Sequence, residues 1–210
     1  EVELMCMMSR KALGVRGPAI EVLAPVFADG LRDAMRAVSF LTKHPIFRKA
    51  ELRVPFAPTT LGLLYRGVMM HYPKQSRWEV DNMWTHASID ELLPGLSRIA
   101  DTLPPAPSHM LWMNWAPPKQ RPDMAFSVED DIYIALYGCW KDAKDDAVHG
   151  HWAEPRMREM AHLASGVQLA DENLGRRPAR FVTAENLRRL DEVRQKYDPE
   201  TRFHPWMGRL

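Results

Sequence analysis

The chain has 210 residues, which is long enough to bury a proper core in one large domain or in one and a half small ones. Its formal net charge is +1, with Lys and Arg spread among Asp and Glu, so nucleic acid and anionic membranes are poor candidates as partners. No apolar run is long enough to span a membrane and no signal peptide is visible, which indicates a soluble chain. The two cysteines, Cys6 and Cys139, lie in apolar strand-like segments and suit free thiols in a reducing compartment, so we expect a cytoplasmic protein.

Hydrophobic periodicity predicts five strands and five helices. In chain order these are strands 2–8 and 19–27, helices 29–44 and 59–72, strand 77–85, helix 88–103, strands 109–115 and 131–140, and helices 145–164 and 183–197. Ser88 and Glu91 form a capping-box pattern, and Thr183 is the expected N-cap of the last helix. The fourth and fifth strands follow one another directly, so they are expected to pair antiparallel. The expected fold is an α+β sandwich of ferredoxin-like character, with an antiparallel sheet, helices on one face and a C-terminal helical tail.

The strand at 131–140 (DIYIALYGCW) carries no charge between Asp131 and Lys141, which is typical of a strand buried on both faces. Side-chain alternation places an apolar set on one face, consisting of Ile132, Ile134, Leu136 and Trp140. The other face carries Tyr133, Ala135, Tyr137 and Cys139. Two phenol hydroxyls need polar partners, so this second face is either a working face or an ordinary core in which both tyrosines bond to backbone.

The neighbouring strands add candidates for the working face. In 77–85, one side carries Trp78, Val80, Asn82 and Trp84, and the other carries Arg77, Glu79, Asp81 and Met83. In 109–115, Trp112 and Asn114 point away from Leu111, Met113 and Trp115. We therefore expect Asn82, Trp112 and Asn114 to bind a substrate together with Tyr133 and Tyr137.

A polar loop follows the helix predicted at 145–164. Its residues Gln168, Asp171, Glu172 and Asn173 lie just beyond a helix end, where carboxylate and carboxamide groups can converge on a ligand. Gln168 is a further substrate-binding candidate, and Asp171 and Asn173 are candidates for cofactor binding. The alternative is an ordinary solvated loop.

Three segments carry recognisable motifs: the C-terminal run Lys196–Phe203 (KYDPETRF), Trp140 followed by Asp142 and Asp145-Asp146, and the opening strand Glu1–Leu4. They resemble, respectively, the KYDPxxxF signature, the W-x-D…DD segment and the strand that leaves the FAD domain in the FAD-linked oxidases of the vanillyl-alcohol-oxidase type, in particular their berberine-bridge-enzyme-like branch. The resemblance implies the C-terminal half of such an enzyme. It divides the chain into 1–17 as the end of a preceding FAD-binding domain, 18–174 as the substrate-binding domain, and 175–210 as a tail that returns to the FAD domain.

Two departures from the family limit what is carried over. The chain has no glycine-rich pyrophosphate loop, so FAD is expected to be bound mainly by a domain absent from this chain. The isolated chain should be inactive, and it should either be colourless or bind FAD only weakly. The family's YxN motif would fall near Val167-Gln168-Leu169, so no aromatic base is carried over and the catalytic residue stays unassigned. His149 and His151 lack a nearby third ligand, and we expect no metal.

The expected function is the substrate-binding portion of an FAD-dependent oxidoreductase that oxidises a small organic molecule by hydride transfer to flavin. The alternative is a stand-alone ferredoxin-like protein that binds a small molecule or a partner without flavin. An apolar tail surface with Phe203 and Trp206 is expected to contact an FAD-binding half or subunit, or a second copy in a homo-oligomer.

Overall fold

The computed structural model describes residues 2–12, 14–54, 58–120 and 123–203. Its strands are β1 (Leu4–Ser9), β2 (Ala19–Leu23), β3 (Arg77–Thr85), β4 (His109–Asn114) and β5 (Ile132–Trp140). Its helices are α1 (Leu31–Ala37), α2 (Ser39–Lys43), α3 (Pro45–Lys49), α4 (Leu61–Met69), α5 (Ile89–Thr102), α6 (Asp146–His149), α7 (Ala153–Glu159) and α8 (Ala184–Tyr197), with short 3-10 turns η1 (Ala143–Asp145) and η2 (Ala161–Leu163).

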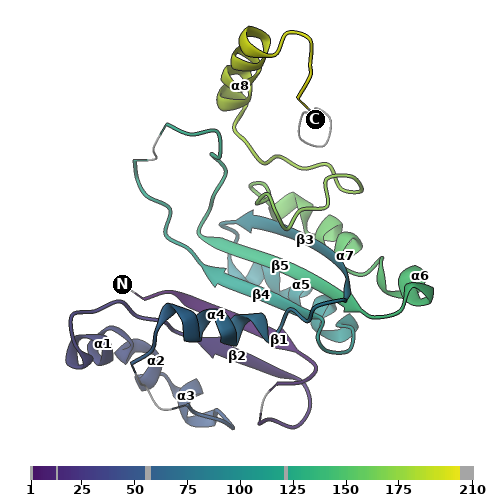
Figure 1. Cartoon of the computed structure of the whole chain (residues 1–210). Helices are drawn as coiled ribbons and strands as arrows, with labels where there is room; N and C mark the ends of the chain where they lie inside the picture. Colours follow the sequence, from purple (N-terminus) through teal and green to yellow (C-terminus); the bar gives the residue numbers. More distant parts are fainter. Residues whose placement is uncertain (1, 13, 55–57, 121–122, 204–210) are drawn as a thin grey trace.

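The strands form one antiparallel sheet with the order β2-β1-β4-β5-β3 (Figure 1). The α+β class is therefore confirmed, as is the antiparallel pairing of β4 with β5. Strand β5 lies between β4 and β3, and its residues from Tyr133 to Cys139 are all buried. The uncharged sequence of this strand is explained by its position, because both of its faces are covered.

Strand β1 lies inside this sheet, between β2 and β4. Residues 1–17 are expected from the sequence to be the end of a preceding domain, and in the structure β1 pairs on both sides with strands of the segment 18–174. The short turn after β1 holds Gly14 and Gly17 at positive φ, 74° and 87°, which lets the chain reverse directly into β2. Cys6 on β1 and Cys139 on β5 are both free thiols.

Helices α5 and α7 cover one face of the sheet (Figure 1). The core on this face is built from Met83, Leu92, Ile99, Leu103, Met110, Ile134, Leu136, Trp152, Ala153, Met157 and Met160. Of the apolar set predicted on β5, Ile134 and Leu136 belong to this core and Ile132 packs against it. Trp140 instead donates its indole N–H to Asp146. Ser88 and Glu91 make the capping box at the start of α5, with both reciprocal hydrogen bonds present.

The helix predicted at 145–164 is interrupted in the structure. It is divided into η1, α6, α7 and η2, with a break at Gly150. A Cβ at this position would lie 2.7 Å from the carbonyl oxygen of Asp146, so the chain passes too closely for a larger residue. After the break, the Glu79 carboxylate accepts hydrogen bonds from the N–H groups of Trp152 (2.7 Å) and Ala153 (2.9 Å) and caps the start of α7.

The opposite face of the sheet carries a second, aromatic core. Its buried members are Trp84, Leu111, Val128, Tyr133, Ala135 and Tyr137. Helix α4 lies over the β1–β2 end of this face, and α8 projects away from the sheet at the other end (Figure 1). Among the residues described, no helix has the length and apolar character needed to cross a membrane.

Candidate functional site

Tyr133 and Tyr137 lie on the sheet face opposite to α5 and α7, as side-chain alternation predicted. Strand register places Tyr133 beside Trp84 of β3 and Tyr137 beside His109 of β4. The ring centroids of Tyr133 and Trp84 are 4.9 Å apart. The two tyrosines are only 3% and 5% exposed, so they form the floor of this face rather than its outer surface.

The hydroxyl groups of both tyrosines donate to a single carboxylate oxygen of the polar loop. Asp171 Oδ2 accepts from Tyr137 at 2.9 Å and from Tyr133 at 3.1 Å. The tyrosines are therefore not the backbone-bonded core residues considered as the alternative. Burial is the main cause that raises the pKa of both phenols far above the usual value, and the negative charge of Asp171 raises them further. Both phenols stay protonated and act as donors to Asp171.

Asn82 fixes the beginning of the polar loop to β3. Its side-chain amide donates to the carbonyl oxygen of Gln168 (2.9 Å), and its side-chain oxygen accepts from the N–H of Gln168 (2.7 Å). Asn82 is fully buried and both of its polar atoms are used by these bonds. Asn82 lies on the same face as Tyr133 and Tyr137, as the alternation of side chains along the strands predicted. Its two hydrogen bonds to Gln168 hold the polar loop in place.

Trp112 and Asn114 are not brought together with the tyrosines. Trp112 is paired with Ile134 of β5 and packs against the helix-side core, and Asn114 lies on the same face at the end of β4. The indole N–H of Trp112 donates to the side-chain oxygen of Asn114 at 3.1 Å. Directly paired residues point to the same face of a sheet. Because Trp112 is paired with Ile134, the expectation that Trp112 and Asn114 lie on the same face as Tyr133 and Tyr137 is wrong.

Two arginines anchor the far end of the polar loop to β3. Arg177 donates to both carboxylate oxygens of Asp81, at 2.7 and 2.5 Å, and to the carbonyl oxygen of Asn82 at 2.6 Å. Arg176 pairs with Glu79 at 3.3 Å. The domain boundary expected at residue 174 thus falls between Gln168 and Arg176, which are both bonded to residues of β3. Side-chain alternation places Glu79 and Asp81 on one side of β3, but no local sequence pattern identifies Arg176 and Arg177 as their partners.

Tyr72 and His109 lie beside Tyr137 and were not predicted as site residues. The His109 ring stacks on Tyr137 with centroids 4.6 Å apart. Its Nδ1–H donates to the carbonyl oxygen of Pro107 (2.9 Å), which leaves Nε2 to accept from the Tyr72 hydroxyl at 3.4 Å. Burial lowers the pKa of His109 to about 4, so the imidazole is neutral near pH 7.

Gly166 seats the polar loop against β3 and leaves no room for a side chain. Its carbonyl oxygen accepts from the N–H of Trp84 at 2.8 Å, and an added Cβ would lie 2.5 Å from the carbonyl oxygen of Arg180. We expect Gly166→Ala to lower the free energy of unfolding by about 1–3 kcal/mol, because backbone must move to admit the methyl group.

Urea unfolding followed by circular dichroism measures this loss. The matched control is Gly67→Ala in α4, where an added Cβ meets nothing within 4 Å and where alanine is expected to raise stability by roughly 0.5–1 kcal/mol. Equal stability of the Gly166→Ala variant and the wild type would show that the loop is not seated as described.

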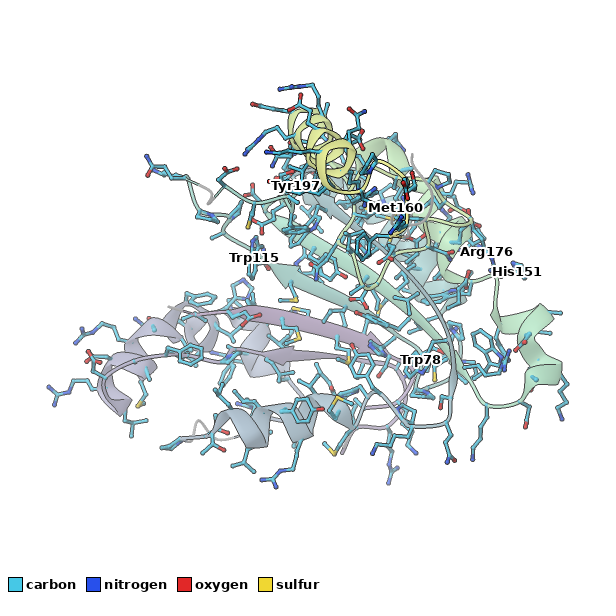
Figure 2. All side chains as sticks on the ribbon, turned by 45° about the horizontal axis from the view of Figure 1, so that its top comes forward. Trp78, Trp115, His151, Met160, Arg176 and Tyr197 are labelled. Atoms are coloured by element: carbon cyan, nitrogen blue, oxygen red, sulfur yellow. The ribbon has the colours of Figure 1, made fainter. Side chains whose placement is uncertain are left out.

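A cavity of about 510 Å³ lies where the polar loop meets β3. It is lined by Trp78, Glu79 and Val80 of β3 and by Asp171, Glu172 and Asn173 of the loop, among others. Figure 2 shows Arg176 and His151 together at one end of the sheet, with Trp78 at the same end and Trp115 near the other. Among the described residues, no group of three metal-ligating side chains is present.

Curated relatives of this chain are FAD-linked oxidoreductases. The FAD-linked oxidoreductase ptmO of Penicillium ochrochloron is 30% identical over 148 residues, which are 70% of this chain and 33% of ptmO. The FAD-linked oxidoreductase penO of Penicillium crustosum is 31% identical over 133 residues, which are 62% of this chain and 29% of penO. The chain thus spans about a third of the length of these relatives. No family model matches it.

Solved flavoenzyme structures share the fold. GilR, an oxidoreductase that catalyses the terminal step of gilvocarcin biosynthesis, superposes with a TM-score of 0.71 at 16% identity, over 98% of this chain and 47% of that chain. For CrmK, a flavoenzyme of caerulomycin biosynthesis, the TM-score is 0.62 at 12% identity, over 97% of this chain and 47% of that one. At these identities the likeness concerns the fold alone.

The chain is therefore related to a segment of FAD-linked oxidoreductases that makes up about a third of their length. The solved structure of GilR, which shares the fold, is also an oxidoreductase. More particularly, ptmO and penO confirm the resemblance to FAD-linked oxidoreductases that the sequence indicated, and GilR and CrmK share the fold over about half of their own chains. FAD is the cofactor to which these relatives are linked by name.

Proposed function

We propose that this chain is the substrate-binding portion of an FAD-dependent oxidoreductase that oxidises a small organic molecule by hydride transfer to flavin. The observation that carries the proposal is the asymmetry of the sheet. Helices α5 and α7 close one face, whereas the other face combines buried aromatic rings with a carboxylate-bearing loop. A ligand approaching that second face meets apolar rings and a few placed polar groups, as is usual for small-molecule sites.

We expect the flavin ring to lie beside the aromatic face. Trp84, Tyr133 and Trp115 form a cluster of tilted rings, in which the ring centroids of Tyr133 and Trp115 lie 4.9 and 6.2 Å from that of Trp84. The indole N–H of Trp84 is buried and has no hydrogen-bond partner among the described residues, which leaves it free to meet an acceptor on a bound group. The described segments hold no glycine-rich phosphate loop, so the phosphates of FAD would be held by another part of the protein. When bound, FAD supplies the hydride-accepting chemistry.

The side chains of this chain would bind, orient and dehydrate the substrate. Tyr133 and Tyr137 hold the Asp171 carboxylate by two hydrogen bonds, and Asn82 with Gln168 holds the loop that carries it. Substrate contacts by these residues, and cofactor contacts by Asp171 and Asn173, remain predictions.

Helix α8 and the following turn support a contact with an FAD-binding half or with a second copy. Val193 is 53%, Tyr197 71% and Phe203 78% exposed, which is unusual for such apolar side chains in one segment. Trp206, predicted at the same contact, lies outside the described residues. A stand-alone protein without flavin is the weaker reading, because ptmO and penO are both named FAD-linked oxidoreductases.

The test is anaerobic mixing of the flavoprotein that contains this chain with benzylic and allylic alcohols and amines, followed by flavin absorbance. At least one compound is expected to bleach the flavin. Deuterium on the carbon that loses the hydride should slow bleaching by about two-fold or more, because that bond breaks in the step observed. Bleaching without an isotope effect would argue against hydride transfer, and the absence of bleaching by any of these compounds would contradict the proposed function.

A further inference from the structure

The segment between β2 and β3 folds into four short helices with few buried residues. Helices α1 to α4 gather at the β2 end of the sheet, away from α6, α7 and α8 (Figure 1). Ala34 is the buried residue of α1, and α2, α3 and α4 contain none. We call residues 31–54 and 58–70, which include these helices, the helical arm. Its side chains therefore find little packing against the sheet.

Large apolar side chains of the helical arm are turned to solvent. In α4 only Arg66 is charged, and Leu61 and Leu63 point about 200° apart around the helix axis, so apolar residues lie on more than one side. A helix of this composition is normally covered all round. So many exposed apolar side chains in one segment mark an interaction surface. Those of the arm that are more than half exposed include Met35, Phe40, Leu61, Leu63, Tyr65 and Met70.

The helical arm also holds the positive charge of the chain. Its seven Lys and Arg residues outnumber its two acidic residues, Asp33 and Glu51, which gives a formal charge of +5. The whole chain has a charge of +1, so the remainder has −4. All seven basic side chains are exposed, and among the described residues only Arg36 of the seven makes an ion pair, with Asp33. The exclusion of anionic membranes, which rested on the charge of the whole chain, therefore does not apply to this surface.

A surface that is both apolar and positively charged matches an anionic lipid bilayer. Apolar side chains enter the boundary between headgroups and acyl chains, while Lys and Arg stay near the anionic headgroups. A second copy is a poorer match, because a twofold interface through this face would bring two charges of +5 together. No helix of the described segments could cross a membrane, so the contact would be with the membrane surface.

We propose that the helical arm docks this protein on the surface of an anionic membrane, with exposed apolar side chains of α1, α2 and α4 in the headgroup region. The arm ends beside the candidate site. The ring centroid of Tyr72 lies 5.4 Å from that of Tyr137 and 5.7 Å from that of Trp78. Docking would therefore bring the tyrosine face close to the lipid. The inference goes beyond the proposed function and requires no step of flavin chemistry.

Co-sedimentation of the flavoprotein that contains this chain with lipid vesicles tests the proposal. One set of vesicles is phosphatidylcholine alone, and in the other about one third of the lipid is phosphatidylserine. The apparent dissociation constant should be about tenfold or more lower for the anionic vesicles, and about 1 M salt should remove the difference by screening. Equal binding to both kinds of vesicle would overturn the proposal. So would the absence of binding, which would mean that another part of the flavoprotein covers the arm.

Neutralising basic residues assigns the binding to the arm. Arg48→Gln/Arg66→Gln should weaken binding to the anionic vesicles about tenfold or more, because each basic residue near the membrane surface contributes roughly fivefold. Lys141→Gln/Lys144→Gln is the matched control, since it removes two exposed charges outside the arm and should leave the dissociation constant nearly unchanged. An equal loss in the two double variants would overturn the assignment.

Replacing exposed apolar residues tests insertion and distinguishes a second copy. Phe40→Ser/Leu61→Ser should weaken vesicle binding about tenfold, whereas Leu93→Ser/Val148→Ser, outside the arm and equally exposed, should not. Unchanged urea midpoints show that these surface variants are folded, and the charge variants decide the question if they are not. Sedimentation velocity without lipid provides the counter-test. A wild type that is dimeric, becomes monomeric with Phe40→Ser/Leu61→Ser and ignores vesicles would assign the arm to a second copy and refute membrane docking.

Discussion

Replacing Arg177 with methionine is expected to lower the free energy of unfolding by about 3–5 kcal/mol. Arg177 is 4% exposed, and its partner Asp81 is fully buried. The methionine would fill much of the arginine volume, but the Asp81 carboxylate would be left in the interior without its positive partner. Because burial already raises the pKa of Asp81 against the effect of Arg177, loss of the arginine removes the main compensation for that burial.

Urea unfolding of three variants beside the wild type distinguishes this mechanism from a general loss of packing. The double variant Asp81→Asn/Arg177→Met has no buried charge, so it should be more stable than Arg177→Met alone. Arg98→Met is the surface control, because Arg98 pairs with Glu159 where the two side chains are 51% and 36% exposed, and it should cost no more than about 1 kcal/mol. A cost for Arg177→Met no larger than for Arg98→Met would refute the prediction.

The stability of the wild type should fall by about 3 kcal/mol between pH 7 and pH 4 through His109 alone. The pKa of His109 is about 4 in the folded chain, against an ordinary value of 6.5. As the pH falls through 6.5, the unfolded chain binds a proton that the folded chain does not, so unfolding becomes easier until the pH approaches 4. The size follows from about 1.4 kcal/mol for each unit of pKa difference.

Other groups also titrate in this range, so the measurement is a difference between two proteins. The free energy of unfolding in urea is determined at several pH values for the wild type and for His109→Gln, which cannot be protonated. The variant should lose less stability on acidification than the wild type, by about 3 kcal/mol. Parallel curves would mean that His109 is protonated normally in the folded chain.

Local sequence patterns were sufficient to identify the strands and the face of β5 that packs under the helices. The uncharged run from Ile132 to Trp140 is a reliable signal, because a strand buried on both faces excludes charge from both of its side-chain sets. The capping box of Ser88 and Glu91 also lies within four residues, and the structure contains both of its bonds. The helix expected over 29–44 is divided at Val38, since α1 ends there and α2 begins anew with its own turn.

The assignment of Trp112 and Asn114 required the register of β4 against β5. Alternation divides each strand into two sets, but it does not say which set of one strand joins which set of its neighbour. The pairing of Trp112 with Ile134 turns Trp112 toward the helices, and the same pairing turns His109 toward Tyr137. His109, which was not predicted as a site residue, thus becomes part of the aromatic face.

Local sequence was sufficient to predict the fold class, the central strand, the two tyrosines on its face opposite the helices and the polar loop with Asp171, because each of these depends on residues that are close together in the chain. The hydrogen-bond partners of these groups became known only from the three-dimensional arrangement. Asp171 is separated by 34 residues from Tyr137, and Arg177 by 96 residues from Asp81. Contacts over such separations depend on sheet order and loop path, and local periodicity carries no information about either.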